Sequence, residues 1–265
     1  MSVETQSVSR LIWTVEGVVS DTDAVVIETP VALVYNGVSH VVTMATPSHL
    51  EDLALGFSLS EGILDSAEQL LDWELHLRDR GVELALTITA EPFARLRQRR
   101  RNLTGRTGCG LCGLESLEQA IPPPAIVTRD YRVGHAALQR AVKALDAAQT
   151  LKRSTGGVHG AAWCDLAGEV RLVREDVGRH NALDKLLGAL SRDRHAGDGF
   201  VLVTSRASYE MVAKVASCDI PILAAVSAPT SLAIEQAVQC GMTLSGYVQP
   251  GRQVIYTHAH RVVEE

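Results

Sequence analysis

The sequence predicts an α/β protein with a smaller, β-rich N-terminal domain (residues 1–124) and a three-layer α/β C-terminal domain (residues 125–265). Apolar residues in the first half recur with a period of two, which is typical of half-buried strands. The second half alternates helical and strand patterns, as domains with a partly parallel sheet do. Between the halves, Pro122-Pro123-Pro124 cannot continue a helix and is the predicted boundary.

The first predicted elements form a β-hairpin. Strands over Val31–Tyr35 and Val38–Met44 flank Asn36-Gly37, a dipeptide that suits the positive φ angles of a tight turn. Alternating apolar residues predict a further half-buried strand over residues 82–88.

A helix is predicted directly after Pro47, because Ser48 and Glu51 have the spacing of a capping box. One face of this helix carries Leu50, Leu53, Ala54 and Phe57. Further on, an arginine-rich loop is predicted to lead into a glycine-flanked Cys-x-x-Cys segment. Its arginines are Arg95, Arg97, Arg99, Arg100, Arg101 and Arg106.

The C-terminal half is predicted to alternate helices and short strands around one sheet. The predicted order is a helix through Leu138–Leu145, strands near 160–164 and 169–173, a helix capped by Asp176 and carrying Leu183–Leu190, a strand over Phe200–Thr204, a helix through Met211 and Val215, a strand over Ile222–Val226, and a helix that begins at Pro229 and ends at Gly241.

Composition limits the class of protein. Hydrophobic residues make up 46% and charged residues 21% of the 265 residues, an ordinary globular balance. The net charge of −6 argues against general nucleic-acid binding, although a local basic patch can still bind phosphate. The sequence has neither a signal-peptide pattern nor an apolar run long enough for a membrane span, so a cytoplasmic protein with reduced cysteines is expected.

Cys109 and Cys112 form the segment with the most chemical information. Flanking glycines leave the sulfur atoms accessible, and the nearby arginines favour the thiolate, which is the nucleophilic form. Three interpretations remain open from the residues alone: half of a zinc site, a redox disulfide, or a carrier of persulfide sulfur. Cys164, Cys218 and Cys240 lie in or beside apolar stretches and are predicted to be small buried hydrophobes.

Three polar segments follow or precede predicted strands of the second half, where α/β sheets bind ligands. They are Ser154–Gly160, Arg174–Asn181 and Ser205–Glu210. Ser205 and Arg206 directly follow a strand and fit a phosphate site. A structural alternative is that Asp176 and Ser205 only cap helices and that Arg179 pairs with Asp184. Residues Tyr247–Arg252 are predicted to form a turn between the last two strands, where Arg252 could bind phosphate or a base.

Together these segments resemble the formate dehydrogenase accessory sulfurtransferase family, FdhD, over essentially the whole chain. The resemblance rests on the order and spacing of the glycine-flanked CxxC, TGGVH (155–159), REDVGRHNALDKLLG (174–188), SRASYEMVAK (205–214) and YVQPGR (247–252). It implies a homodimer that receives sulfur from a cysteine desulfurase and passes it to the molybdenum cofactor, Mo-bis(molybdopterin guanine dinucleotide), before that cofactor enters formate dehydrogenase.

The resemblance also implies roles for particular residues. Cys109 corresponds to the persulfide site, with Cys112 as its partner. The implied cofactor-binding residues are Tyr247, Val248, Gln249, Pro250, Gly251 and Arg252, with Ser205 and Arg206 in a pocket for a GDP-like guanine nucleotide. An anionic, phosphate-rich cofactor also suits the arginines before the CxxC.

The resemblance further implies a cytidine deaminase-like fold for the C-terminal domain. Zinc deaminases need His-x-Glu and a Pro-Cys-x-x-Cys, but His159 is followed by Gly160 and Ala161. No bound metal is therefore expected. A second hypothesis is that the protein is a non-catalytic chaperone, which binds and escorts the molybdenum cofactor without carrying sulfur.

Overall fold

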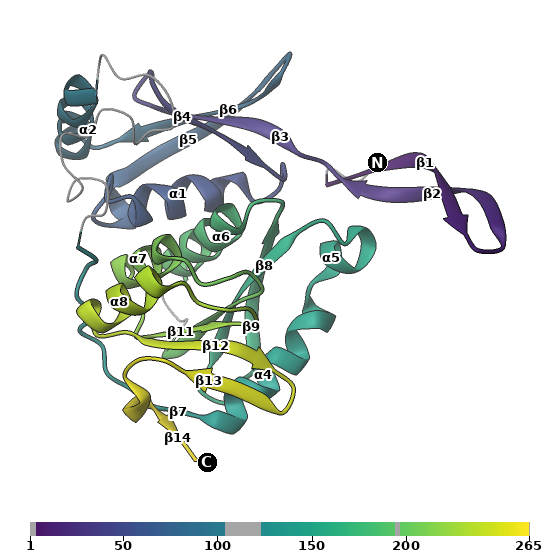
Figure 1. The fold of residues 1–265 in the computed structure, drawn as a ribbon. Helices are drawn as coiled ribbons and strands as arrows, with labels where there is room; N and C mark the ends of the chain where they lie inside the picture. Colours follow the sequence, from purple (N-terminus) through teal and green to yellow (C-terminus); the bar gives the residue numbers. More distant parts are fainter. Residues whose placement is uncertain (1–3, 104–122, 194–196, 265) are drawn as a thin grey trace.

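The computed structural model describes residues 4–103, 123–193 and 197–264, and side chains as far as residue 98 in the first of these ranges (Figure 1). A four-stranded sheet forms from the N-terminal half of the chain and a six-stranded sheet from the C-terminal half, and helices pack between and around them. The predicted α/β class is confirmed. The domain boundary at Pro124 remains a prediction, because residues 104–122 lie outside the described part of the chain.

The N-terminal sheet has the strand order β4-β3-β6-β5. Its strands are β3 (Thr29–Tyr35), β4 (Val38–Ala45), β5 (Leu70–Arg78) and β6 (Gly81–Ile88). The predicted hairpin is confirmed: Asn36 and Gly37 have φ angles of 46° and 79°. Helix α1 (Leu50–Ser60) contributes Leu53 and Ala54 to the core beneath this sheet. Strand β5 was not predicted, although its apolar and polar residues alternate.

Two local predictions in this half are wrong. Helix α1 begins after His49, which has a left-handed φ of 51° and makes no side-chain cap, so Ser48 and Glu51 do not form a capping box. The arginine-rich segment was predicted to be a loop, but it is helical up to residue 103. It forms helix α2 (Ala90–Leu103), which follows the short 3-10 turn Ala67–Gln69 and strands β5 and β6 in the chain.

An N-terminal arm precedes the first sheet. We use this name for the antiparallel hairpin of β1 (Thr5–Thr14) and β2 (Gly17–Val26). The arm extends away from both sheets (Figure 1). It was not predicted, because its strands carry several polar residues and its apolar residues do not mark a single buried face.

Among the described strands of the C-terminal half, six form one sheet. In sheet order they are β13 (Arg252–Ile255), β12 (Thr243–Gln249), β11 (Ile222–Ala225), β10 (Gly199–Val203), β8 (His159–Asp165) and β9 (Val170–Asp176). Strands β10, β11 and β12 are parallel to one another, which confirms a partly parallel sheet. A separate short pair joins β7 (Val133–Gly134) to β14 (Val262–Val263), just after the 3-10 turn Ala259–Arg261.

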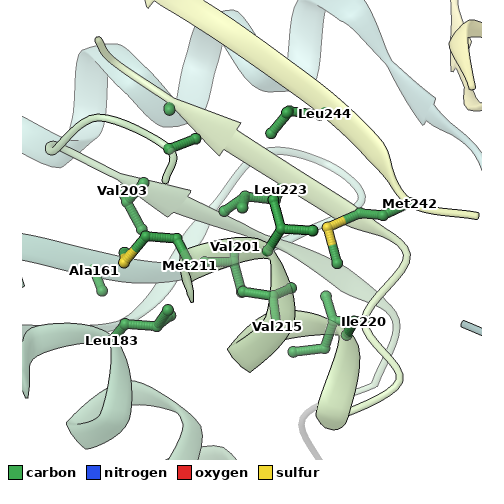
Figure 2. Packing of buried hydrophobic residues seen from close by; sticks show 14 of the residues in the cluster. Ala161, Leu183, Val201, Val203, Met211, Val215, Ile220, Leu223, Met242 and Leu244 are labelled. Atoms are coloured by element: carbon green, nitrogen blue, oxygen red, sulfur yellow. The ribbon is translucent and has the colours of Figure 1, made fainter. Parts of the chain in front are cut away.

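Helices cover both faces of the six-stranded sheet. Phe200 and Leu202 pack on one face with α4 (His135–Ala148), which is followed by the short α5 (Thr150–Thr155). Val201 and Val203 point to the other face, into a core shared with α6 (Arg179–Arg192), α7 (Tyr209–Ser217) and α8 (Ser231–Cys240) (Figure 2). This alternation along β10 places the sheet between two helical layers.

The ends of the C-terminal helices correct two predictions. Asp176 is not a helix cap, since the N-cap residue of α6 is Gly178. Pro229 is not the first residue of α8: Thr230 is the N-cap, and its hydroxyl accepts a hydrogen bond from the Ala233 N–H. Gly241, with a φ of 79°, ends α8 as predicted.

The two halves meet where α1 crosses α6. A methyl group at Gly56 would lie 1.7 Å from the Asp184 carbonyl oxygen, and one at Gly188 would lie 2.0 Å from the Asp52 carbonyl oxygen. Glycine at both positions therefore lets the two helix backbones touch. In the part of the chain described, no helix is long and apolar enough to cross a membrane.

Candidate functional site

The predicted sulfur-carrying residues, Cys109 and Cys112, lie outside the described residues, as does Arg106. The helix that leads toward them shows how some of the arginine charge is used. Arg95 pairs with Asp65 at 2.6 Å and with Glu91 at 3.1 Å, and the Arg97 guanidinium lies 5.9 Å from the centre of the Phe93 ring. Arg95 is thus already neutralised and contributes less to a positive potential than its sequence position indicates.

The three described cysteines are poor nucleophiles. Cys164 and Cys240 are fully buried, as predicted, and Cys218 is half-buried against the core. Burial raises the pKa of Cys164 to about 12 and the pKa of Cys218 to about 11, and it also raises the pKa of Cys240. Because the thiolate is the reactive form, none of the three is suited to accept sulfur at neutral pH.

The candidate ligand site lies at the carboxyl edge of the C-terminal sheet. The carboxyl edge consists of the loops that follow β10, β11 and β12, together with the start of β8 and the end of β9. Backbone hydrogen bonds join these loops: the Thr204 N–H donates to the Gly160 carbonyl at 3.0 Å, and the Tyr247 N–H donates to the Ser227 carbonyl at 3.1 Å. Ala207 forms a bridge with Pro229 between them. The three predicted polar segments and the Tyr247 turn therefore meet at this edge.

The segment after β10 presents a cation and a helix N-terminus. Arg206 is exposed, whereas Ser205 is buried and its hydroxyl donates to the Arg206 carbonyl at 3.0 Å. Helix α7 begins two residues later with Ser208 as N-cap, and the Ser208 side chain makes no capping hydrogen bond. Free N–H groups at a helix start and a nearby guanidinium are suited to binding phosphate.

The turn after β12 is held in a fixed shape. Tyr247 has a positive φ of 50°, and the Arg252 guanidinium lies 5.5 Å from the centre of its ring. Gln139 on α4 accepts from the Gly251 N–H at 2.7 Å and donates to the Arg252 carbonyl at 3.2 Å. Tyr247, Gln249, Pro250, Gly251 and Arg252 are exposed.

Val248 differs from its neighbours in this turn. Its side chain is fully buried in the core beneath the sheet, so only its backbone can face a ligand. Two features of the edge were not predicted from the sequence: the support of the turn by Gln139 and the presence of the segment Ser227–Pro229. The position of Ser227–Pro229 could have been predicted, since this segment follows the apolar strand β11.

Most of the REDVGRHNALDK segment joins the two halves of the molecule. Asp176 and Lys185 are both fully buried and form an ion pair of 2.6 Å. Asp176 accepts a hydrogen bond from the Thr46 N–H at 3.0 Å, and Lys185 donates to the Thr46 carbonyl at 2.9 Å. Asn181 donates to the Met44 carbonyl at 2.7 Å. These residues hold the end of β4, so their main role is structural.

A second group of charges supports the same junction. The structural alternative in which Arg179 pairs with Asp184 on the surface is not found, because Asp184 is buried beside Lys214 (3.1 Å) and accepts from the Ser60 hydroxyl at 2.7 Å. Burial raises the pKa of Asp184. Burial opposes the charge on Lys214, but Asp184 and Glu61 outweigh it and raise the pKa of that lysine. Arg174 and Arg192 both bind Asp52 on α1.

A cavity of about 460 Å³ lies between β4 and the start of α6. His180 and Glu210 line it, with the His180 Nε2 2.8 Å from the Glu210 Oε2, and Lys214 closes one side. A second cavity, of about 900 Å³, is lined by Cys218 and Asp219. Neither of these two cavities is lined by Arg206 or by the Tyr247–Arg252 turn.

Within the described ranges, one group of three side chains could hold a metal ion: His49, Glu51 and Asp52. Asp52 is already bound by two arginines, which makes it a poor metal ligand. His159, the residue compared with the deaminase zinc ligand, lies in β8 and is followed by Gly160 and Ala161, which are buried. These side chains do not fit a deaminase zinc site.

The histidines at the edge predict a pH dependence of stability. Burial lowers the pKa of His159, assisted by Arg179, and burial lowers the pKa of His180 against the effect of Glu210. Both histidines therefore bind protons less readily in the folded protein than in the unfolded chain, where the pKa of histidine is about 6.5. As the pH falls below this value, protonation favours the unfolded chain. We therefore expect the melting temperature to fall as the pH is lowered from about 7 to about 5.5. The His159→Gln/His180→Gln variant should show a flatter decline, and an unchanged decline would contradict this assignment.

These features define an α/β protein whose C-terminal sheet presents an exposed guanidinium group and a helix N-terminus at its carboxyl edge. The chain belongs to the FdhD/NarQ family, whose model matches residues 26–263. It is 54% identical to the sulfur carrier protein FdhD of Cupriavidus necator over 244 residues. The aligned residues cover 92% of this chain and 85% of that protein. The sulfur carrier protein FdhD of Xanthomonas euvesicatoria is 52% identical over 241 residues, covering 91% and 86% of the two chains.

A solved structure shares the fold. The crystal structure of a formate dehydrogenase accessory protein from Desulfotalea psychrophila matches with a TM-score of 0.75 and 25% sequence identity. The match covers 98% of this chain and all of that one. The family inferred from the sequence segments is therefore confirmed, while the individual site residues remain predictions.

Proposed function

We propose that this protein is a sulfur carrier required for formate dehydrogenase activity and that Cys109 is its sulfur-binding residue. The observation that supports Cys109 is the state of the three described cysteines: Cys164 and Cys240 are buried, Cys218 is half-buried, and all three have raised pKa values. Cys109 and Cys112 are the remaining thiols, and the arginines that precede them in the sequence favour a thiolate. The relatives named as sulfur carriers support the same role.

The proposed activity is a sulfurtransferase reaction in two steps. First, the Cys109 thiolate attacks the outer sulfur of a persulfide on a cysteine desulfurase, the sulfur–sulfur bond breaks, and the desulfurase cysteine leaves as a thiolate. Cys109 then holds the sulfane sulfur as a persulfide. Second, this sulfur passes to the metal of the acceptor and the Cys109 thiolate is released. If the sulfur is delivered as sulfide, the metal supplies the two electrons for its reduction.

The acceptor is the molybdenum cofactor carrying two guanine dinucleotides, bound before its insertion into formate dehydrogenase. We place its phosphates and guanine at the carboxyl edge, near Arg206, the start of α7, and the Tyr247–Arg252 turn. The exposed guanidinium groups and free helix N–H groups support this placement. A GDP-like nucleotide would bind the same surface. The proposal includes a cytoplasmic location and a cytidine deaminase-like arrangement of the C-terminal domain.

Intact-protein mass spectrometry tests the carrier step. After incubation with an active cysteine desulfurase and cysteine, we expect a gain of about 32 Da, the mass of one sulfur atom, as for a persulfide. The gain should disappear in Cys109→Ala and persist in Cys218→Ser, the matched control with a shielded thiol. If the wild type gains no sulfur, the protein is not a carrier. The alternative of a non-catalytic cofactor chaperone would then be favoured, because the anion-binding edge does not depend on the CxxC.

A further inference from the structure

The cavity of about 900 Å³ that Cys218 and Asp219 line lies at the amino ends of the parallel strands, and we call it the amino-end cavity. Its lining includes Gly197, which lies just before β10, and residues 217–220, which lead into β11. The candidate ligand site is formed by the loops at the opposite, carboxyl ends of these strands. The amino-end cavity is therefore separate from the surface proposed to hold the acceptor.

The buried part of its lining is apolar. Leu64, Trp163, Leu187 and Ile220 line the cavity, and each of them is almost fully buried. Leu64 follows α1 in the N-terminal half of the chain, whereas the other three belong to the C-terminal half. A large, partly apolar cavity between two parts of a protein is typical of a binding site.

The polar part of the lining is mostly acidic. One cation, Arg129, lines the cavity together with four carboxylates, which are those of Asp65, Glu68, Asp193 and Asp219. Arg129 pairs with Asp198, and Asp65 pairs with Arg95 at 2.6 Å. With these two pairs included, five carboxylates are set against two guanidinium groups among the described residues.

Asp219 is held in its charged form largely by neutral groups. Its carboxylate accepts hydrogen bonds from the Thr128 N–H at 2.6 Å and from the Thr128 hydroxyl at 2.7 Å. Burial opposes the charge, but these hydrogen bonds, assisted by Arg129, outweigh burial and lower the pKa of Asp219. Because the Thr128 donors are uncharged, they leave the negative charge of the carboxylate in place.

Three helices end at the amino-end cavity. Leu59 lies in the last turn of α1, Leu190 and Ser191 lie in the last turn of α6, and Ser217 is the last residue of α7. The last carbonyl groups of a helix lack intrahelical donors and carry a partial negative charge. The helix ends and the carboxylates together favour a cationic group in the cavity over an anionic one.

We infer that the amino-end cavity is the docking site of the protein that donates sulfur, and that it receives a loop of this partner in which a lysine or arginine lies beside apolar side chains. The inference rests on the proposed sulfur-carrier role. Charge complementarity supports a basic partner and argues against the phosphate-rich acceptor at this position.

The position of the cavity supports the same partner. Ala125, which lines the cavity, comes 13 residues after Cys112, so the segment proposed to carry sulfur rejoins the described chain beside it. A donor at the amino ends of the strands and an acceptor at their carboxyl ends do not compete for one surface. The two steps of sulfur transfer can then follow each other without exchange of the bound acceptor.

Two charge-reversal variants test the docking. Glu68→Lys/Asp193→Lys changes two exposed carboxylates of the cavity and should weaken binding to cysteine desulfurase about tenfold, because like charges would then meet at the contact. Glu235→Lys/Glu264→Lys changes the net charge equally, at exposed positions that do not line the cavity, and should bind like the wild type. Biolayer interferometry with immobilised desulfurase measures both dissociation constants. Wild-type affinity of the cavity variant, or equal weakening of the control, would overturn the inference.

A small sulfur donor separates docking from carrier chemistry. Glutathione persulfide needs no docking surface, so Glu68→Lys/Asp193→Lys should take up its sulfur as fully as the wild type, measured as a gain in intact mass, while uptake from the desulfurase slows. Equal loss of uptake from both donors would overturn the inference, because the variant would then act on Cys109 itself. If the wild type binds desulfurase through the cavity but gains no sulfur from either donor, the carrier role alone would fail.

A photo-cross-linking amino acid at Ser191 identifies what occupies the cavity. In a mixture with desulfurase, we expect cross-links to a desulfurase peptide that contains lysine or arginine next to apolar residues. Cross-links formed only within this chain or between its copies would overturn the inference, since the cavity would then be filled by the protein itself. Unchanged circular dichroism of each variant confirms that it remains folded.

Discussion

Cells whose only copy of this protein carries Cys109→Ala should contain formate dehydrogenase protein that is inactive, with activity reduced to the level of a deletion strain. None of the three described cysteines is suited to replace Cys109, because Cys164 and Cys240 are buried and the half-buried Cys218 has a raised pKa. Burial raises the pKa of Cys218 to about 11, so at pH 7 its thiol is almost entirely in the unreactive, protonated form. Formate-dependent dye reduction in extracts, normalised to the amount of formate dehydrogenase protein, measures the effect.

Two further variants show which step fails. Cys218→Ser should support normal activation, because the half-buried Cys218 takes no part in sulfur transfer. Arg206→Ala/Arg252→Ala should still take up sulfur but should fail to activate the enzyme, since those residues are proposed to hold the acceptor rather than the sulfur. Normal activation by Cys109→Ala, combined with failure of the arginine variant, would instead identify the protein as a cofactor chaperone.

The sequence was informative where local chemistry determines structure. Asn36-Gly37 predicts its hairpin because few dipeptides accept two positive φ angles, and Gly241 predicts the end of α8 for the same reason. The apolar strand β10 was predictable because the side chains of residues 200–203 are buried on both faces of a central strand. The carboxyl edge follows from the parallel strand order, which brings the loops after β10 and β12 to one side of the sheet.

The sequence was misleading where the partner of a residue lies far along the chain. Asp176 looks like a helix cap from its neighbours, but it binds the Thr46 N–H, 130 positions away. Asp184 appeared available to Arg179, yet it faces Ser60 across the helix crossing. The arm was missed for another reason: its apolar tip has no buried face within one chain, so it lacks the alternation that burial imposes.

The buried pair of Asp176 and Lys185 leads to the second large effect, which is on folding. Lys185→Met removes the cation and leaves the Asp176 carboxylate fully buried without its counter-charge. Burial lowers the pKa of Lys185 and Asp176 opposes this effect, so the charge on the lysine depends on its buried counter-charge. Breaking such a pair on one side costs about 3–5 kcal/mol. Urea unfolding monitored by circular dichroism should show a midpoint shifted to much lower urea in Lys185→Met.

A double variant separates the charge from the packing. Lys185→Met/Asp176→Leu removes both charges, so it should be more stable than Lys185→Met alone, although the Thr46 N–H and carbonyl each lose a partner and prevent full recovery. Arg78→Ala, which breaks an exposed ion pair with Glu83, serves as the control and should leave the midpoint nearly unchanged. If Lys185→Met unfolded at the same urea concentration as the control, the pair would not hold β4 against α6. The junction would then depend on the close crossing of α1 and α6 at Gly56 and Gly188, together with the second group of charges around Asp52 and Asp184.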